Sequence, residues 1–166
     1  MASWKNADGL TIYYGKDEGK VGNGGEYESD GLWREVEVVL NLASLTSTSA
    51  VVSKVQIPDS FQIGRVEVIA DTAATSGGSA TLNVGFAELV TGTAVATTGA
   101  VAALPLANIN VDGERKQLDP GVTYAGTLVG GVISTTKTTV ITAFYDTAAF
   151  TAGKVRVRLF LNRKAK

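Results

Sequence analysis

The sequence predicts an all-β fold: an antiparallel β-sandwich or jelly-roll-like domain preceded by an arm, with at most one short helix. Several short runs alternate apolar and polar residues with a period of two, which is typical of half-buried strands. Turn residues such as Asp112-Gly113 and Asp119-Pro120-Gly121 separate these runs, and no long helical pattern lies between them. Short strands joined by tight turns indicate packed antiparallel sheets.

Residues 1–31 form a polar, glycine-rich segment that holds one short β-like run at 10–14. Such a segment buries little surface by itself, so we expect a contact with the domain or a neighbour to order it. It contains four of the chain's aromatic residues: Trp4, Tyr13, Tyr14 and Tyr27. Exposed aromatics are costly unless they find a surface, which favours an arm over a disordered tail. We therefore divide the chain into an arm, 1–31, and a β-sandwich domain, 32–166.

The first run of the domain, 32–40, places Val36 and Val38 on one face and two glutamates on the other. The same alternation recurs at 63–70, 81–89, 139–145 and 154–162, with weaker runs at 50–57 and 121–132. In the run 139–145 it points Val140, Thr142 and Phe144 inward. The predicted core includes Val36, Val38, Val66, Val68, Leu82, Val84, Phe86, Val155, Val157 and Leu159.

The stretch 91–110 departs from this pattern because it is rich in alanine and low in complexity. Residues 100–108 predict a short helix, interrupted at Pro105, that caps one end of the sandwich. The alternative is a loose loop.

The composition excludes several chemistries. The 166 residues include no His and no Cys, which removes an imidazole base, a thiolate nucleophile and a Cys/His zinc cage. Glu35 and Glu37 form a carboxylate pair on one strand, but pairing with Arg65, Arg156 and Arg158 on neighbouring strands explains them without a reaction. We expect no enzyme activity, no metal and no cofactor.

The net charge and the hydropathy of the sequence limit the classes of partner that we expect. A net charge of −1 gives no general attraction to phosphate, so we expect neither nucleic acid nor a membrane as a partner. The first residues lack the apolar run of a secretory signal, and no stretch approaches the length of a spanning helix. We therefore expect the protein to be made and retained in a cytoplasm, or assembled there.

The end of the sequence is locally basic, with Lys154, Arg156, Arg158, Arg163, Lys164 and Lys166 close together. The two arginines of the run 154–162 share a face with Phe160. One interpretation is an edge strand that charge protects from aggregation. The other is a docking surface for an acidic partner, such as a protein shell.

The order of several segments along the sequence resembles that of a known protein family. An Asn6-x-Asp8-Gly9-Leu10 opening is followed by segments at 57–71 and 77–86, the alanine-rich stretch and a closing strand at 150–162. Together they resemble the small β-rich head decoration, or cement, proteins of tailed double-stranded DNA bacteriophages. The resemblance implies a structural virion protein that binds the capsid exterior and stabilises the major capsid protein shell, with no catalytic residues.

The resemblance also implies an assembly. We expect the major capsid protein as partner, and self-association as a homotrimer, with a dimer next. The candidate interface residues, toward the capsid or a second subunit, are Trp4, Tyr13, Tyr14, Arg156, Arg158, Arg163 and Lys164. The alternative function is a glycan-binding or fibre-head module, for which Trp4, Trp33, Tyr13, Tyr14 and Tyr27 are the candidate stacking residues.

Overall fold

The computed structural model describes residues 2–5, 11–14 and 34–163. The chain divides into two compact units, Met1–Leu32 and Trp33–Lys166. In the first unit, β1 (Ala2–Lys5) and β2 (Thr11–Tyr14) pair antiparallel, with Ala2 opposite Tyr14. The β-like run expected at 10–14 therefore contains a strand, and its partner is a strand that the alternation did not indicate.

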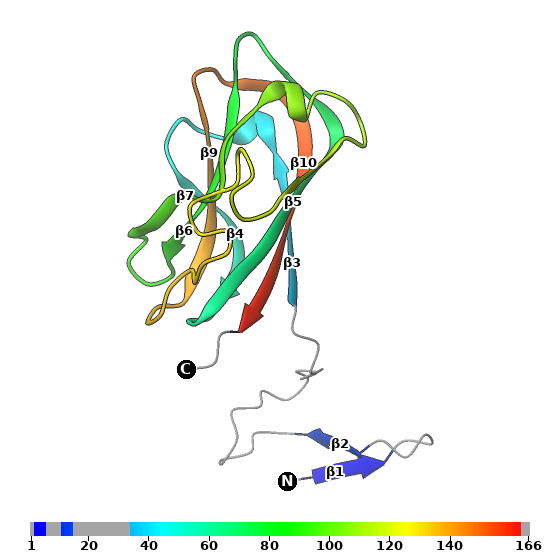
Figure 1. Cartoon of the computed structure of the whole chain (residues 1–166), viewed down its shortest axis with the longest axis vertical. Helices are drawn as coiled ribbons and strands as arrows, with labels where there is room; N and C mark the ends of the chain where they lie inside the picture. Colours follow the sequence, from blue (N-terminus) through cyan, green and yellow to red (C-terminus); the bar gives the residue numbers. More distant parts are fainter. Residues whose placement is uncertain (1, 6–10, 15–33, 164–166) are drawn as a thin grey trace. The chain divides into compact units, whose positions relative to one another are not determined.

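The described part of the second unit contains eight strands in two four-stranded antiparallel sheets (Figure 1). One sheet has the order β3-β10-β5-β8 and the other the order β4-β9-β6-β7. The bounds are β3 (Arg34–Asn41), β4 (Ala50–Ile57), β5 (Phe61–Ser76), β6 (Thr81–Glu88), β7 (Ala94–Pro105), β8 (Arg115–Leu118), β9 (Thr139–Asp146) and β10 (Phe150–Arg163). Single 3-10 turns, η1 (Leu42–Ser44) and η2 (Leu106–Asn108), follow β3 and β7.

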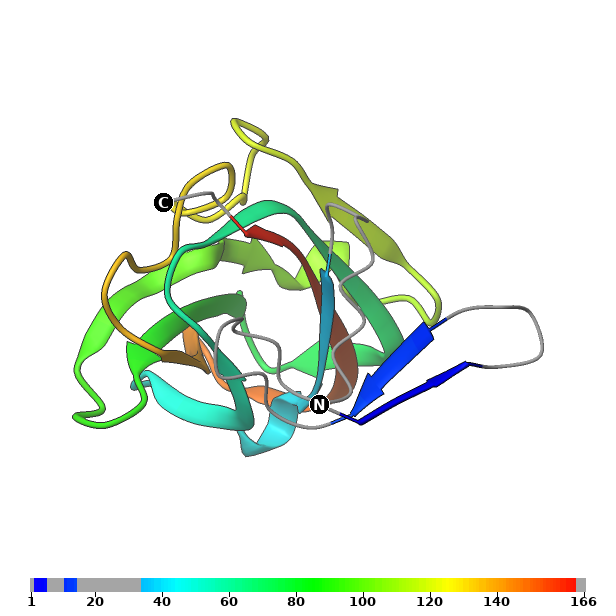
Figure 2. The same ribbon diagram turned by 90° about the horizontal axis from the view of Figure 1, so that it is seen from below.

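The strand pairs are nested. β3 pairs with β10, β4 with β9, β5 with β8 and β6 with β7, so the domain is one long hairpin of four strand pairs. Further pairing of β10 with β5 and of β9 with β6 rolls this hairpin into two layers. Figure 2, which looks from below the view of Figure 1, shows the strands curving around a common interior. This arrangement is the jelly roll, which confirms the all-β prediction and distinguishes between its two forms.

The core lies between the two sheets, where alternate residues of each strand meet. Val66, Val68 and Val84 are fully buried there, as the alternation predicts. Of the predicted core residues, only Val36 is half-buried, and it packs against the edge of the core. The core also contains Leu42, Ile57, Phe61, Ile63, Leu104, Ile109, Leu118, Ile133 and Phe150.

The predicted helix at 100–108 is wrong. Residues through Pro105 belong to β7, and only the single turn η2 follows it. β7 completes the sheet by pairing with β6, with Leu104 opposite Leu82 and Val101 opposite Val84. Pairing and burial of these side chains outweigh the helix propensity of alanine, which is the highest of any residue but only a weak determinant against tertiary context. Within residues 34–163 no helix is long and apolar enough to cross a membrane.

The inward face predicted for β9 is also wrong. Ile141 and Ala143 join the core, whereas the alternation pointed to Val140, Thr142 and Phe144. Val140 and Thr142 are nevertheless buried, so both faces of this strand are covered there. A strand covered on both faces loses the polar alternation that would reveal its inner side.

The weak run at 121–132 is not a strand. Residues 122–134, which we call the closing segment, instead join the edge of β7 to the beginning of β5. Toward β7, the amide of Gly126 donates to the carbonyl oxygen of Ala100 at 3.0 Å, and the amide of Leu128 donates to that of Gly99 at 2.9 Å. The segment thus satisfies backbone groups that the edge strand would otherwise leave free.

Toward β5, the closing segment takes the place of a neighbouring strand where β8 does not reach. Ile63 accepts from the amide of Gly130 at 2.6 Å and donates to the carbonyl oxygen of Gly131 at 3.0 Å. The amide of Ile133 donates to the carbonyl oxygen of Phe61 at 2.9 Å. One seam of the sandwich is therefore closed by backbone hydrogen bonds to both sheets.

Substitution of Gly126 tests this closure. A Cβ at Gly126 would overlap the backbone of Gly99 and Ala100, so we expect Gly126→Ala to lower the free energy of unfolding by about 1–3 kcal/mol, the usual cost of overpacking. Urea denaturation followed by circular dichroism measures the change. Gly77→Ala is the matched control because a Cβ there meets nothing within 4 Å. Equal stability of the two variants would contradict the close approach.

Candidate functional site

The predicted basic residues Arg156 and Arg158 lie on the outer face of the sheet β3-β10-β5-β8. Their strand, β10, is paired on both sides, with β3 and with β5. The interpretation of this strand as a protected edge is therefore wrong, because its neighbours on the two sides already shield its backbone. The predicted common face of the two arginines and Phe160 agrees with the strand register.

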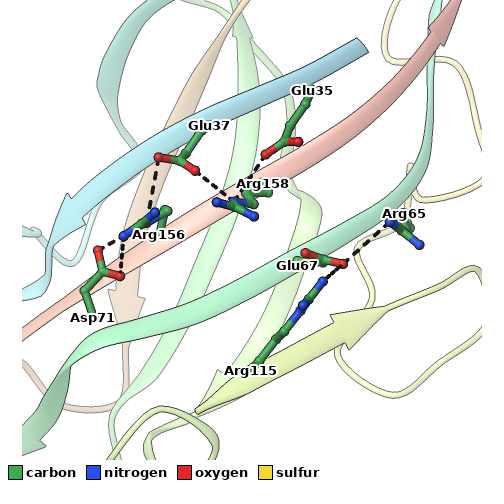
Figure 3. Close-up of polar contacts among 8 residues, drawn as sticks. All are labelled: Glu35, Glu37, Arg65, Glu67, Asp71, Arg115, Arg156 and Arg158. Atoms are coloured by element: carbon green, nitrogen blue, oxygen red, sulfur yellow. Dashed lines mark hydrogen bonds and ion pairs between the residues drawn. The ribbon is translucent and has the colours of Figure 1, made fainter. Parts of the chain in front are cut away.

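Both arginines are engaged by carboxylates of their own chain (Figure 3). Nε of Arg158 lies 2.8 Å from Oε2 of Glu37 and 3.2 Å from Oε1 of Glu35. Arg156 donates to both oxygens of Asp71, through Nη2 at 2.8 Å and Nε at 3.3 Å, and lies 3.7 Å from Glu37. The predicted cross-strand pairing of Glu35 and Glu37 is confirmed for Arg156 and Arg158, whereas Arg65 pairs with Glu67.

Neighbouring carboxylates stabilise the protonated, charged form of Arg156. The hydrogen bond to Asp71, together with the negative charges of Asp71 and Glu37, raises the pKa of Arg156 above its ordinary value. Because the pKa of Arg156 is higher in the folded than in the unfolded protein, its ion pair stabilises the fold fully at any pH below the unfolded-state pKa. This stabilisation is lost only as the pH rises through the folded-state pKa. Arg156 therefore remains a cation, paired with Asp71, throughout the neutral range.

A third group on this face is Glu67, whose side chain is 0% exposed. Arg115 of β8 donates a hydrogen bond to Oε1 of Glu67, and Nη2 of Arg65 lies 3.7 Å from the same oxygen. Arg65 also lies over the ring of Phe160, 4.1 Å from its centroid. The other oxygen of Glu67 has no hydrogen-bond partner among the described residues. A buried carboxylate of this kind depends on its cations.

We call these residues the charged face: Glu35, Glu37, Arg65, Glu67, Asp71, Arg115, Arg156 and Arg158. Carboxylates and guanidinium groups balance one another across it, so an acidic partner must compete with internal ion pairs for each arginine. Among the residues that the structure describes, no three acidic side chains are grouped to hold a metal ion. The face is suited to holding four strands in register.

The other predicted interface residues lie elsewhere. Arg163 is exposed at the end of β10, opposite Phe61. In the first unit, Trp4 lies opposite Ile12, and Tyr13 lies opposite Ser3 in the same ribbon as Tyr14. Lys164 and the candidate stacking residues Tyr27 and Trp33 lie outside the described residues. The predicted set is thus spread over a sheet face, one end of the domain and the separate N-terminal unit.

A groove lies on the seam opposite the closing segment, between the edge strands β3 and β4. Its volume is about 350 Å³. Its described lining is uncharged and contains no aromatic ring: Val39, Leu40, Asn41, Ser44, Leu45, Thr46, Ala50, Val51, Val52 and Ala143. It therefore lacks the aromatic platform on which the glycan-binding alternative depends.

Sequence reasoning missed two kinds of residue. Asp71 and Arg115 complete the charged face, but only the strand register brings them to their partners. Leu89 and Val90 form an exposed apolar pair at the turn between β6 and β7. Leu89 closed the predicted run 81–89, so the sequence did not mark it as exposed.

Two arginine substitutions separate the buried from the exposed ion pairs. Arg115→Ala leaves the buried Glu67 with only the more distant Arg65, so we expect a loss of about 3 kcal/mol of unfolding free energy. Arg158→Ala removes pairs with Glu35 and Glu37, which are 44% and 36% exposed, and we expect about 1 kcal/mol or less. Chemical denaturation measures both, and a larger effect at Arg158 would refute this ranking.

Comparison with solved structures identifies proteins of similar fold. No protein-family model matches the sequence, and no curated protein matches it either. A chain in the capsid of Ralstonia phage GP4 matches the structure with a TM-score of 0.52 and 14% identity, over 82% of this chain and 87% of that chain.

Two further solved structures are similar. A chain in the acidic stable capsid structure of Helicobacter pylori bacteriophage KHP30 has a TM-score of 0.48 and 13% identity, over 81% of this chain and 90% of that chain. A chain in the capsid asymmetric unit of cyanophage Pam1 has a TM-score of 0.44 and 15% identity, over 78% and 82% respectively. The likeness to the GP4 chain is one of fold: this jelly roll has a counterpart in a phage capsid.

Proposed function

We propose that the protein is a structural virion protein that binds the outer surface of a phage capsid and cements its major capsid protein subunits. The observation that carries this proposal is the fold shared with a chain of the GP4 phage capsid over most of both chains. The order of sequence segments, which resembles phage head decoration proteins, supports the outer surface as the binding position. The role requires binding and needs no catalytic group.

The N-terminal unit is the proposed anchor. β1 and β2 form a two-stranded ribbon, and such a ribbon is only marginally stable in water unless it packs on another surface. The sequences of β1 and β2 include Trp4, Tyr13 and Tyr14, and truncation of a well-buried aromatic anchor commonly costs about 2 kcal/mol or more. A capsid surface would supply the packing that the ribbon lacks.

The basic residues contribute less in this proposal. Arg156 and Arg158 are already paired within the charged face, so an acidic partner gains little from them. Arg163 and Lys164, at the end of β10 and just beyond it, would add charge complementarity at the rim of the contact.

Symmetry and multivalency suggest how copies of the protein would be arranged on a shell. We propose a homotrimer on three-fold positions, with a dimer across two-folds as the next arrangement, because closed symmetry lets identical chains satisfy one another's surfaces. Each copy then needs only a modest interface, since linked contacts raise the effective concentration of the remaining ones.

Deletion of residues 1–31 tests the anchor. We expect the truncated protein to keep its β-rich circular dichroism spectrum, because the core lies within residues 34–163. Its co-sedimentation with shells assembled from the major capsid protein encoded beside its gene should fall sharply. Full-length protein that does not sediment with these shells would reject the proposed function, and truncated protein that binds as tightly as full-length protein would reject the anchor.

A wash at high salt distinguishes binding through apolar contacts from binding through ion pairs. At 1 M NaCl the Debye length falls to about 3 Å, which weakens rim ion pairs, whereas apolar burial persists. We expect the protein to stay on the shells in this wash and Trp4→Ala and Tyr13→Ala to release it. Complete release of the unchanged protein at 1 M NaCl, with no effect of the two substitutions, would assign attachment to the basic residues.

A further inference from the structure

The two sheets of the described domain have four edges, and two of these are clearly protected against pairing with another chain. The edge of β7 is bonded to the closing segment, through the amides of Gly126 and Leu128 among others. The edge strand β8 is only four residues long and begins with Arg115 and Lys116. Short edge strands and charged side chains on them are devices by which proteins avoid unwanted strand pairing.

The edge of β4 is protected as well. Its ladder with β9 is interrupted by a register shift between Val51 and Gln56, and the exposed Lys54 lies within the interruption. A distorted backbone and a lysine both make this edge a poor template for a further strand. Proteins usually guard their edges in such ways, so an edge without these devices needs an explanation.

The edge of β3 lacks these devices. β3 pairs with β10 through a continuous register over Arg34–Asn41, and it pairs with no other strand among those that the structure describes. Its sequence contains neither Pro nor Lys. Its carboxylates, Glu35 and Glu37, reach toward the arginines of β10 (Figure 3), on the side away from the free edge. The free side of β3 is therefore a regular edge, open to a further strand.

Apolar side chains gather beside this edge. Val39 of β3 is 46% exposed, and Val51 and Val55 of the neighbouring β4 are 55% and 40% exposed. Val39 and Val51 both line the uncharged groove between the two strands. Unpaired backbone beside exposed apolar side chains is typical of a surface that another chain covers.

The core-facing side of β3 is complementary to itself. Val36, Val38 and Leu40 share this side. Two antiparallel copies of β3 related by a two-fold axis beside Val38, perpendicular to the sheet, would place Val38 opposite Val38 and Val36 opposite Leu40. The inner faces of the two copies would then continue each other, as the period of two requires.

The outer side of β3 fits the same axis. Glu37 of one copy would lie opposite Val39 of the other, and Glu35 opposite Asn41, so no carboxylate would face a carboxylate. Moving the axis by one residue toward the start of β3 would place Glu37 opposite Glu37, and like charges directly opposite are destabilising. The charge pattern therefore favours the axis at Val38 and selects a second copy of this chain as the occupant.

We propose that β3 pairs antiparallel with β3 of a second copy about this two-fold axis. The pairing joins the sheet β3-β10-β5-β8 of each copy into one continuous sheet. It uses the β3 edge of both copies, so the assembly closes at two chains. The inference goes beyond the proposed function because it needs no shell, and of the two arrangements proposed above it selects the dimer.

Two substitutions of opposite charge at one position test the pairing in full-length protein. Val39→Glu would face Glu37 of the second copy twice in each dimer, and we expect the dissociation constant of the dimer to rise at least about tenfold. Val39→Lys would face the same carboxylate with the opposite charge, so its dissociation constant should stay within about threefold of that of the unchanged protein. Arg156 lies opposite position 39 within each chain, in monomer and dimer alike.

Sedimentation velocity over a range of concentrations measures these constants, and circular dichroism checks that each variant is folded. Val111→Glu is the matched control, because Val111 is 60% exposed and precedes β8, the strand at the other edge of the same sheet. It should leave dimerisation unchanged. Unchanged protein that is monomeric or trimeric would overturn the inference, as would a dissociation constant of Val39→Glu equal to that of the unchanged protein.

A single cysteine tests the axis, because the sequence contains no cysteine of its own. In the proposed dimer the Cα atoms of the two copies of residue 38 are about 4.5–5.5 Å apart, so Val38→Cys should form a disulfide-linked dimer on mild oxidation. The two copies of residue 36 are about 13 Å apart along the strands, so Val36→Cys should not. The reverse pattern, or no cross-link in Val38→Cys, would overturn the self-pairing. Binding to shells, measured by co-sedimentation, remains the separate test of the proposed function.

Discussion

The ladder between β10 and β5 is the interaction on which the rest of the domain depends. It runs from Phe150 opposite Ser76 to Arg163 opposite Phe61, and it joins two strands from different pairs of the long hairpin. Without it and the matching ladder of β9 with β6, the nested pairs would make a ribbon with both faces in water. With both ladders the ribbon rolls, and Val66, Val68, Val155 and Val157 turn toward a shared interior that excludes water.

The same ladder also builds the charged face. Arg158 lies opposite both Glu37 and Glu67 in register, and Arg156, opposite Val39 and Ile69, reaches Asp71 and Glu37 diagonally. A slip of one residue would bury these charges and expose the valines, so the ion pairs and the core select the same register. The charged face is therefore part of how the fold is specified.

Much of this fold was accessible from the sequence because β3, β5 and β10 alternate buried and more exposed residues over most of their length. β6 is covered on both faces, but its sequence still alternates the large residues Leu82, Val84 and Phe86 with smaller or polar ones. The prediction failed where that contrast is lost. β9 is covered on both faces, and in β7 the two large buried residues Val101 and Leu104 are three positions apart across a register shift, which breaks the period of two. The closing segment resembled a strand because it makes strand-like bonds to two different sheets, which no single alternation describes.

The candidate site was less accessible for a physical reason. Arg156 and Arg158 were visible as a basic pair, but their net effect depends on Asp71 and Glu37, which come from other strands. A sequence shows how many basic residues lie close together along the chain. The potential at the folded surface depends also on which of them are paired with carboxylates from other strands. The apolar pair at the β6–β7 turn was missed because local hydropathy does not distinguish a residue that ends a strand from one that stands beyond it.

The nesting of the strands has a consequence for biosynthesis. Glu37 and Arg158, which face each other across β3 and β10, are 121 positions apart in the chain. A growing polypeptide therefore carries β3 and β4 for most of its translation before their partners leave the ribosome, while β6 and β7 can pair at once. We expect folding to be slow, because folding rates fall as the contacting residues lie farther apart in the sequence. A nascent chain therefore remains without one of the two central strands of the sheet β3-β10-β5-β8 until β10 has emerged.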